Sequence, residues 1–103
     1  MDRMAALSMI ESGDDDLAIG KAGEISRYQL TKHTWRVTTA LPLSSAVNPQ
    51  LAYQVASCAI LVRKNAFIAS HHREPTDKEF YRLWNPHCPN ETAQRFANLC
   101  DRK

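Results

Sequence analysis

One long segment, residues 49–70, limits what this chain can fold into. Asn48-Pro49 places a capping residue directly before a proline at the first helical position, a strong start signal for a helix. The residues that follow are apolar on nearly every side of that helix: Leu51, Ala52, Val55, Ala56, Cys58, Ala59, Ile60, Leu61, Val62, Ala66 and Phe67. A helix that is apolar most of the way round is buried among other elements. We therefore predict a central buried helix over residues 49–70.

Two shorter helices are predicted before this segment. Asp2 is a candidate cap for a helix over residues 2–12, and Thr31 for a brief helix over residues 31–37. The apolar anchor of the brief helix is Trp35. The inner face of the first helix carries Met4, Leu7 and either Ile10 or Met9. Between the two helices, we predict that residues 17–30 form a loop. This loop would contain, at most, two very short strands paired as a β-hairpin.

Two more helices are predicted after it. Thr76-Asp77-Lys78-Glu79 is a capping box that opens a helix ending at Trp84, before Pro86. Asn90 is the candidate cap of a last helix, whose inner face carries Ala93, Phe96, Ala97 and Cys100. No repeat or linker divides the chain. We therefore predict a single, mainly α domain over residues 1–103.

Composition excludes several classes of function. Thirteen basic and eleven acidic residues leave a net charge of +2, which is too small to indicate binding to nucleic acid or to an anionic membrane. No run approaches the roughly 18 uninterrupted apolar residues of a membrane span. Gly20 and Gly23 do not form a phosphate-binding loop, so a nucleotide site is not predicted.

The cysteines and histidines do not predict a metal or cofactor site. Cys58, Cys88 and Cys100 contain no Cys-x-x-Cys pair, and their spacing to His71-His72 and His87 matches no zinc-ligand pattern. The histidines are predicted to lie on the surface or at a helix end. If a disulfide exists, Cys88–Cys100 is the favoured pair; three reduced, buried thiols are the alternative.

Glu11 is the candidate catalytic residue. It lies at the end of the first helix, on or beside its apolar face. Both the negative end of the helix dipole and apolar surroundings disfavour ionisation of a carboxyl group. A carboxyl group with a raised pKa is protonated in a larger fraction of molecules near neutral pH. It can therefore act as a general acid there. The alternative is an ordinary solvated glutamate at a helix end.

Three motifs in order resemble the soluble lytic transglycosylase and goose-type lysozyme group of the lysozyme-like superfamily. They are Glu11-Ser12, then Gly23-Glu24-Ile25-Ser26-Arg27-Tyr28-Gln29, and then Leu83-Trp84-Asn85. In that group a Glu-Ser pair closes the catalytic helix, and a Gly-x-x-Gly-x-x-Gln motif ends eighteen residues after the Glu, as Gln29 does here. The resemblance spans residues 6–85 and implies an α+β lysozyme-like fold.

The chain departs from the family pattern at two places. The second glycine of the motif is Ser26, which tolerates fewer backbone conformations. The family's Tyr-Asn pair, whose hydroxyl hydrogen-bonds the catalytic carboxylate, reads Trp84-Asn85. An indole N–H can donate a hydrogen bond but cannot accept one. Tyr28 and Tyr81 are the candidates for supplying the lost hydroxyl.

The resemblance implies an enzyme that cleaves peptidoglycan without a cofactor or metal. Glu11 would be the general acid and base of a lytic transglycosylase, which leaves 1,6-anhydro ends. A hydrolytic lysozyme usually needs a second carboxylate; Glu24 is the stronger candidate, since Asp14, Asp15 and Asp16 read as a solvated turn. The predicted substrate-binding residues are Ser12, Glu24, Tyr28, Gln29, Trp84 and Asn85.

Two other readings of the sequence are kept open. One is a non-catalytic glycan-binding or scaffold module of the same fold, and the other is an unrelated small helical interaction domain. Residues 1–4 lack the basic leader and apolar core of a signal peptide. The chain is thus either cytoplasmic or a trimmed mature domain; the resemblance favours an extracytoplasmic location after trimming. A monomer is expected.

Overall fold

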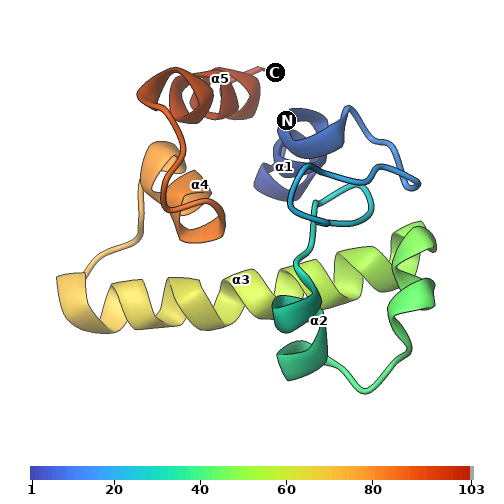
Figure 1. Ribbon diagram of the computed structural model, residues 1–103. Coiled ribbons are helices and arrows are strands. Elements are labelled where there is room, and N and C mark those ends of the chain that lie inside the picture. Colours follow the sequence, from blue (N-terminus) through green and yellow to red (C-terminus); the bar gives the residue numbers. More distant parts are fainter. Residues whose placement is uncertain (103) are drawn as a thin grey trace.

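The chain is mainly helical, with α1, α4 and α5 on one side of a single long helix, α3 (Figure 1). A computed structural model describes residues 1–102. In chain order the elements are α1 (Arg3–Ser12), α2 (Lys32–Thr38), the short 3₁₀ helix η1 (Leu43–Val47), α3 (Pro49–His71), α4 (Asp77–Trp84) and α5 (Asn90–Cys100). The mainly α prediction is confirmed, and the five α-helices lie close to their predicted ranges.

Side-chain caps explain where four of these helices begin. Asp2, Thr31 and Asn48 each accept a hydrogen bond from a free N–H in the first turn of α1, α2 and α3. Thr76 and Glu79 form the predicted capping box of α4. The prediction for α5 is wrong in detail: Asn90 is its first helical residue, preceded by Pro89, and no side chain caps it. The Asn90 side chain instead accepts a hydrogen bond from Arg82.

The loop between α1 and α2 differs from the prediction. Residues 17–30 contain only isolated antiparallel bridges, Ile19 with Ile25 and Ile25 with Leu30, so the very short strands of the predicted β-hairpin do not form. In the connection between α2 and α3, the 3₁₀ helix η1 forms a turn and buries Ala46.

The prediction that α3 is a buried central helix is only partly right. Only the face formed by Ala52, Val55, Ala56, Ala59 and Ile60 is buried. The opposite face is exposed at Cys58, Leu61, Val62 and Ala66, and the exposed fraction of Val62 is 70%. The physical reason is visible in Figure 1, where α1, α4 and α5 all lie on the same side of α3. Too few elements exist to cover the other side.

The core is shared between all the helices rather than centred on α3. The largest fully buried apolar side chains come from α1, the loop before α2, α2, α4 and α5: Leu7, Leu30, Trp35, Tyr81 and Phe96. Helix α5 packs on both α1 and α4, while α3 packs on α2, η1 and α4. In α1, Met4 and Ile10 pack against this core, whereas Met9 is 41% exposed. The inner face of α1 therefore uses Ile10.

The cysteines are all free thiols. The Cys88–Cys100 bridge is not formed; both residues are half-buried and pack against the core as small apolar groups. Cys58 is exposed on α3, so the alternative of three buried thiols is also only partly right. None of the helices in residues 1–102 has the length and apolarity needed to cross a membrane.

Two substitutions on α3 test this one-sided burial. Val55→Asp should destabilise the domain by about 3–5 kcal/mol, because it places an unpaired charge on the buried face, where Val55 is 4% exposed. Val62→Asp on the exposed face should change the free energy of unfolding by less than about 0.5 kcal/mol. Chemical denaturation followed by circular dichroism measures both. Equal losses would show that α3 is buried on both sides.

Candidate active site

Glu11 lies in the last turn of α1 and faces Tyr81 from α4. The Tyr81 hydroxyl donates a hydrogen bond to a carboxylate oxygen of Glu11 at 2.7 Å, across 70 positions of sequence. Gly13 ends α1 two residues later, in the left-handed conformation that glycine adopts most easily. Glu11 therefore stands at a helix end that is fixed both by a glycine cap and by a contact with another helix.

The surroundings of Glu11 favour its protonated form. Burial raises the pKa of this carboxyl above its usual value of 4.5, and the nearby Glu24 carboxylate raises it further. The hydrogen bond from Tyr81 acts in the opposite direction, because it stabilises the carboxylate. Burial is the largest of the three effects. The result is the property that a general acid requires.

Tyr81 is held as a hydrogen-bond donor. Its side chain is 2% exposed, and its ring packs against Phe96 with 5.2 Å between ring centroids. Burial and the Glu11 carboxylate both raise the pKa of the Tyr81 hydroxyl, while Asn85 lowers it. Because the hydroxyl keeps its proton, it can donate to Glu11 when the carboxyl is ionised.

Glu11 opens into a hollow of about 310 Å³, which we call the Glu11 hollow. Its lining includes five of the seven predicted site residues, brought together from α1, the 17–30 loop and the end of α4: Glu11, Glu24, Gln29, Trp84 and Asn85. Thr31 and Pro86 complete it. The remaining two predicted residues, Ser12 and Tyr28, lie outside the hollow.

Glu24 and Gln29 converge above Gly20. A Cβ atom at Gly20 would lie 2.2 Å from a Glu24 carboxylate oxygen and 2.5 Å from the Gln29 amide oxygen. A larger residue at position 20 would therefore displace the ends of both side chains. The Gln29 amide nitrogen also donates to the carbonyl oxygen of Ser26 at 2.9 Å. These contacts hold the Gln29 side chain in place at the wall of the hollow.

The Trp84 indole does not hydrogen-bond to Glu11. Its indole N–H donates to the carbonyl oxygen of Tyr28 at 2.9 Å. Of the two tyrosines considered as replacements for the family's hydroxyl, Tyr81 makes the contact with Glu11, and Tyr28 is buried in the core. Trp84 instead ties the end of α4 to the loop that carries Gln29.

Ser12 and Ser26 shape the loop rather than the hollow. The Ser12 hydroxyl donates to the carbonyl oxygen of Arg27 at 2.8 Å and accepts from the backbone N–H of Asp15 at 3.0 Å. Ser26, where the family has glycine, is buried with a φ of 64°. It thus adopts the left-handed conformation that glycine would adopt at lower cost.

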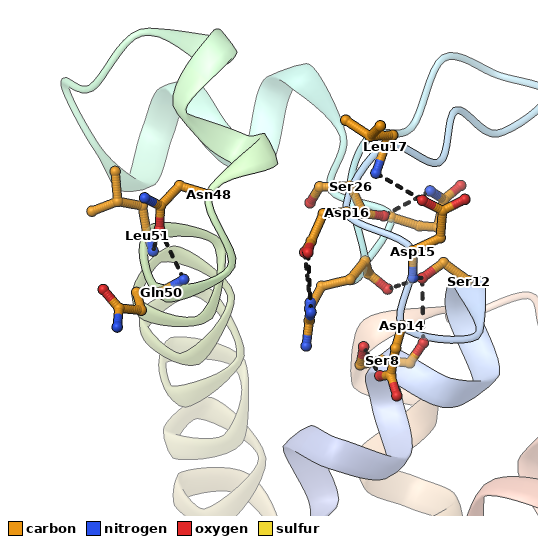
Figure 2. A network of polar contacts seen from close by, with 12 residues as sticks. Ser8, Ser12, Asp14, Asp15, Asp16, Leu17, Ser26, Asn48, Gln50 and Leu51 are labelled. Atoms are coloured by element: carbon orange, nitrogen blue, oxygen red, sulfur yellow. Dashed lines mark hydrogen bonds and ion pairs between the residues drawn. The ribbon is translucent and has the colours of Figure 1, made fainter.

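The three consecutive aspartates are engaged in the turn after α1, as Figure 2 shows, and are not simply solvated. Asp14 accepts from the Ser8 hydroxyl, and Asp15 from the backbone N–H of Leu17. Asp16 pairs with the Arg27 guanidinium at 2.7 Å, which lowers the pKa of Asp16. None of the three lines the Glu11 hollow, so Glu24 is the second carboxylate at this site.

No cluster of three or more His, Cys, Asp or Glu side chains within residues 1–102 could hold a metal ion. His71 stacks on Phe67 at the end of α3, and His72 ends that helix in a left-handed conformation. Both histidines are exposed at the helix end, where the sequence places them.

Sequence reasoning missed three residues of the site: Thr31, Pro86 and Gly20. Thr31 is identified in the sequence only as a helix cap and Pro86 only as a helix stop. Gly20 lies directly under the ends of the Glu24 and Gln29 side chains, which only the structure reveals. The one signal in the sequence was the position of Gly20, three residues before the motif that begins at Gly23.

No model of a known protein family, no curated protein and no solved structure matches this chain. The residues of the Glu11 hollow and their geometry are therefore the features of this chain that indicate a function.

The opposing effects on Glu11 can be separated by titration. Tyr81→Phe should raise the pKa of Glu11, because the carboxylate loses a hydrogen-bond donor. Glu24→Gln should lower it, because a neighbouring like charge is removed. Nuclear magnetic resonance titration of the Glu11 side-chain carboxyl measures both shifts. Shifts in the reverse directions would contradict this account of the site.

Proposed function

We propose that this chain cleaves peptidoglycan at the β-1,4 bond between N-acetylmuramic acid and N-acetylglucosamine, as a lytic transglycosylase of the lysozyme-like superfamily. The observation that carries the proposal is a half-buried Glu11 with a raised pKa, held by Tyr81 at the edge of a hollow that also contains Gln29 and Asn85. This arrangement pairs a general acid with polar groups that can orient a sugar.

The reaction needs one acid that also serves as base. Protonated Glu11 donates its proton to the glycosidic oxygen, and the bond from this oxygen to the anomeric carbon breaks. The Glu11 carboxylate then takes the proton of the sugar's own C6 hydroxyl. The C6 oxygen bonds to the anomeric carbon and closes a 1,6-anhydro ring without water. The Tyr81 hydroxyl stabilises Glu11 while it is ionised between the two steps.

A hydrolytic lysozyme is the second candidate, and one observation favours it. Glu24 lines the same hollow as Glu11 and lies close enough to raise its pKa. A second carboxylate in this position could activate water or stabilise positive charge on the sugar ring. The two reactions leave different ends, 1,6-anhydro for the lyase and reducing for the hydrolase.

Substrate binding is assigned to the polar and aromatic groups of the Glu11 hollow. Gln29 and Asn85 offer amide groups to sugar hydroxyl and acetamido groups, and Trp84 offers an apolar wall. Ser12 and Tyr28, also predicted to bind substrate, act through the loop that they hold. The glycan strands of the bacterial wall would be the partner, which requires an extracytoplasmic location. A glycan-binding module without catalysis is the outcome if Glu11 proves dispensable.

Glu11→Gln should abolish cleavage of purified peptidoglycan while leaving glycan binding nearly unchanged. The amide keeps the size of the side chain but has no proton to donate, and general acid catalysis contributes about 10²–10⁴-fold. The loss should reach the top of that range, because Glu11 also acts as base. Gln29→Ala and Asn85→Ala disturb only positioning and should cost less. Mass spectrometry of the released muropeptides measures activity and identifies their ends.

Two controls accompany this variant. Glu91→Gln makes the same change at an exposed position on α5 and should retain full activity. Folding disfavours ionised Glu11, because its pKa in the folded chain lies above 4.5. The free energy of unfolding of Glu11→Gln at pH 7 should therefore be equal to or higher than that of the parent. Full activity of Glu11→Gln would refute the catalytic role.

A further inference from the structure

Arg63 lies on α3, outside the Glu11 hollow, yet it bonds to the segments that form two of the walls. Its guanidinium donates to the carbonyl oxygen of Leu83 at 2.9 Å and reaches that of Trp84 at 3.5 Å. These carbonyls belong to the end of α4, where backbone oxygens lack helical partners. A second guanidinium nitrogen donates to the Thr34 hydroxyl of α2 at 3.2 Å. One side chain therefore joins α2, α3 and α4.

Arg63 also lies against the indole of Trp84. The central carbon of its guanidinium is 5.3 Å from the ring centroid, within the range of a cation–π contact. The indole N–H is used on the Tyr28 carbonyl oxygen. The Trp84 ring is thus held on one side by Arg63 and at its edge by the loop that carries Gln29.

The bond to Thr34 leads to a second wall of the hollow. The Thr34 hydroxyl oxygen accepts a hydrogen bond from the Thr31 hydroxyl at 2.9 Å, and Thr31 lines the Glu11 hollow. Trp84 and Thr31 come from segments more than fifty positions apart. Arg63 is the side chain that contacts one of them directly and the other through Thr34.

We propose that Arg63 is a positioning residue, which sets the place of the Trp84 and Asn85 wall relative to the Thr31 and Gln29 wall. Its effect on cleavage rests on the function proposed above. A guanidinium is needed because its planar fork donates in several fixed directions and stacks on an aromatic ring at the same time. Lysine keeps the charge but has neither the fork nor the flat face.

The variant Arg63→Lys tests this role. We expect KM for soluble, uncross-linked glycan strands to rise roughly tenfold, with kcat changed by less than about threefold, because the binding walls move and Glu11 does not. The indole N–H resonance of Trp84 should shift. That of Trp35, which donates to the Leu41 carbonyl oxygen, should stay in place and report an intact fold. Thr34→Val removes only the link to Thr31 and should give a smaller rise in KM.

Arg73 provides a matched control. It also stacks on an aromatic ring, at 5.2 Å from the Phe67 centroid, and pairs with Glu79, but its hydrogen bonds go to Glu74 and Glu79, which do not line the Glu11 hollow. Arg73→Lys should leave KM and the Trp84 resonance unchanged. An equal change in both variants, or a loss of kcat without a change in KM, would overturn the proposal.

The Trp84 resonance separates this inference from the proposed function. A parent chain that cleaves no glycan defeats the proposed function. In that case, an unchanged Trp84 indole resonance in Arg63→Lys defeats the positioning role as well, and a shifted one supports it.

Discussion

The hydrogen bond between Tyr81 and Glu11 is the contact on which the rest of the site depends. It joins the end of α1 to the middle of α4 and does so at the border of the apolar core. A half-buried carboxyl is costly to ionise unless a donor faces it. The fold therefore keeps Glu11 both difficult to ionise and able to exist as a carboxylate, which is the balance that acid and base catalysis by one group requires.

The loop between α1 and α2 contains residues with an unfavourable backbone conformation. Ser26 and Gln29 both have positive φ values, a conformation that costs a residue other than glycine about 1–3 kcal/mol. Bonds from Ser12 to the loop backbone and from Asp16 to Arg27 compensate for part of this cost. As a result, Glu24 and Gln29 are directed over Gly20 and into the hollow.

The long helix α3 forms no part of the hollow, yet it supports two of its walls. Its buried face supplies small and branched apolar residues, against which α2 and α4 pack. Arg63 emerges at the edge of that face and bonds to both of these helices. The exposed apolar residues on the other face follow from the small number of elements in residues 1–102, which leave that face of α3 uncovered.

The sequence by itself determined the local features of this protein. Caps, helix ends and the place of Glu11 follow from short-range hydrogen bonding and apolar spacing, which neighbouring residues decide. Tertiary structure decided which tyrosine meets Glu11 and which face of α3 is buried. Each of these depends on groups that are distant in sequence. Trp84, adjacent to Asn85, was the natural candidate to contact Glu11; one helical turn earlier, Tyr81 points toward α1, and only the packing of α4 on the core makes that choice.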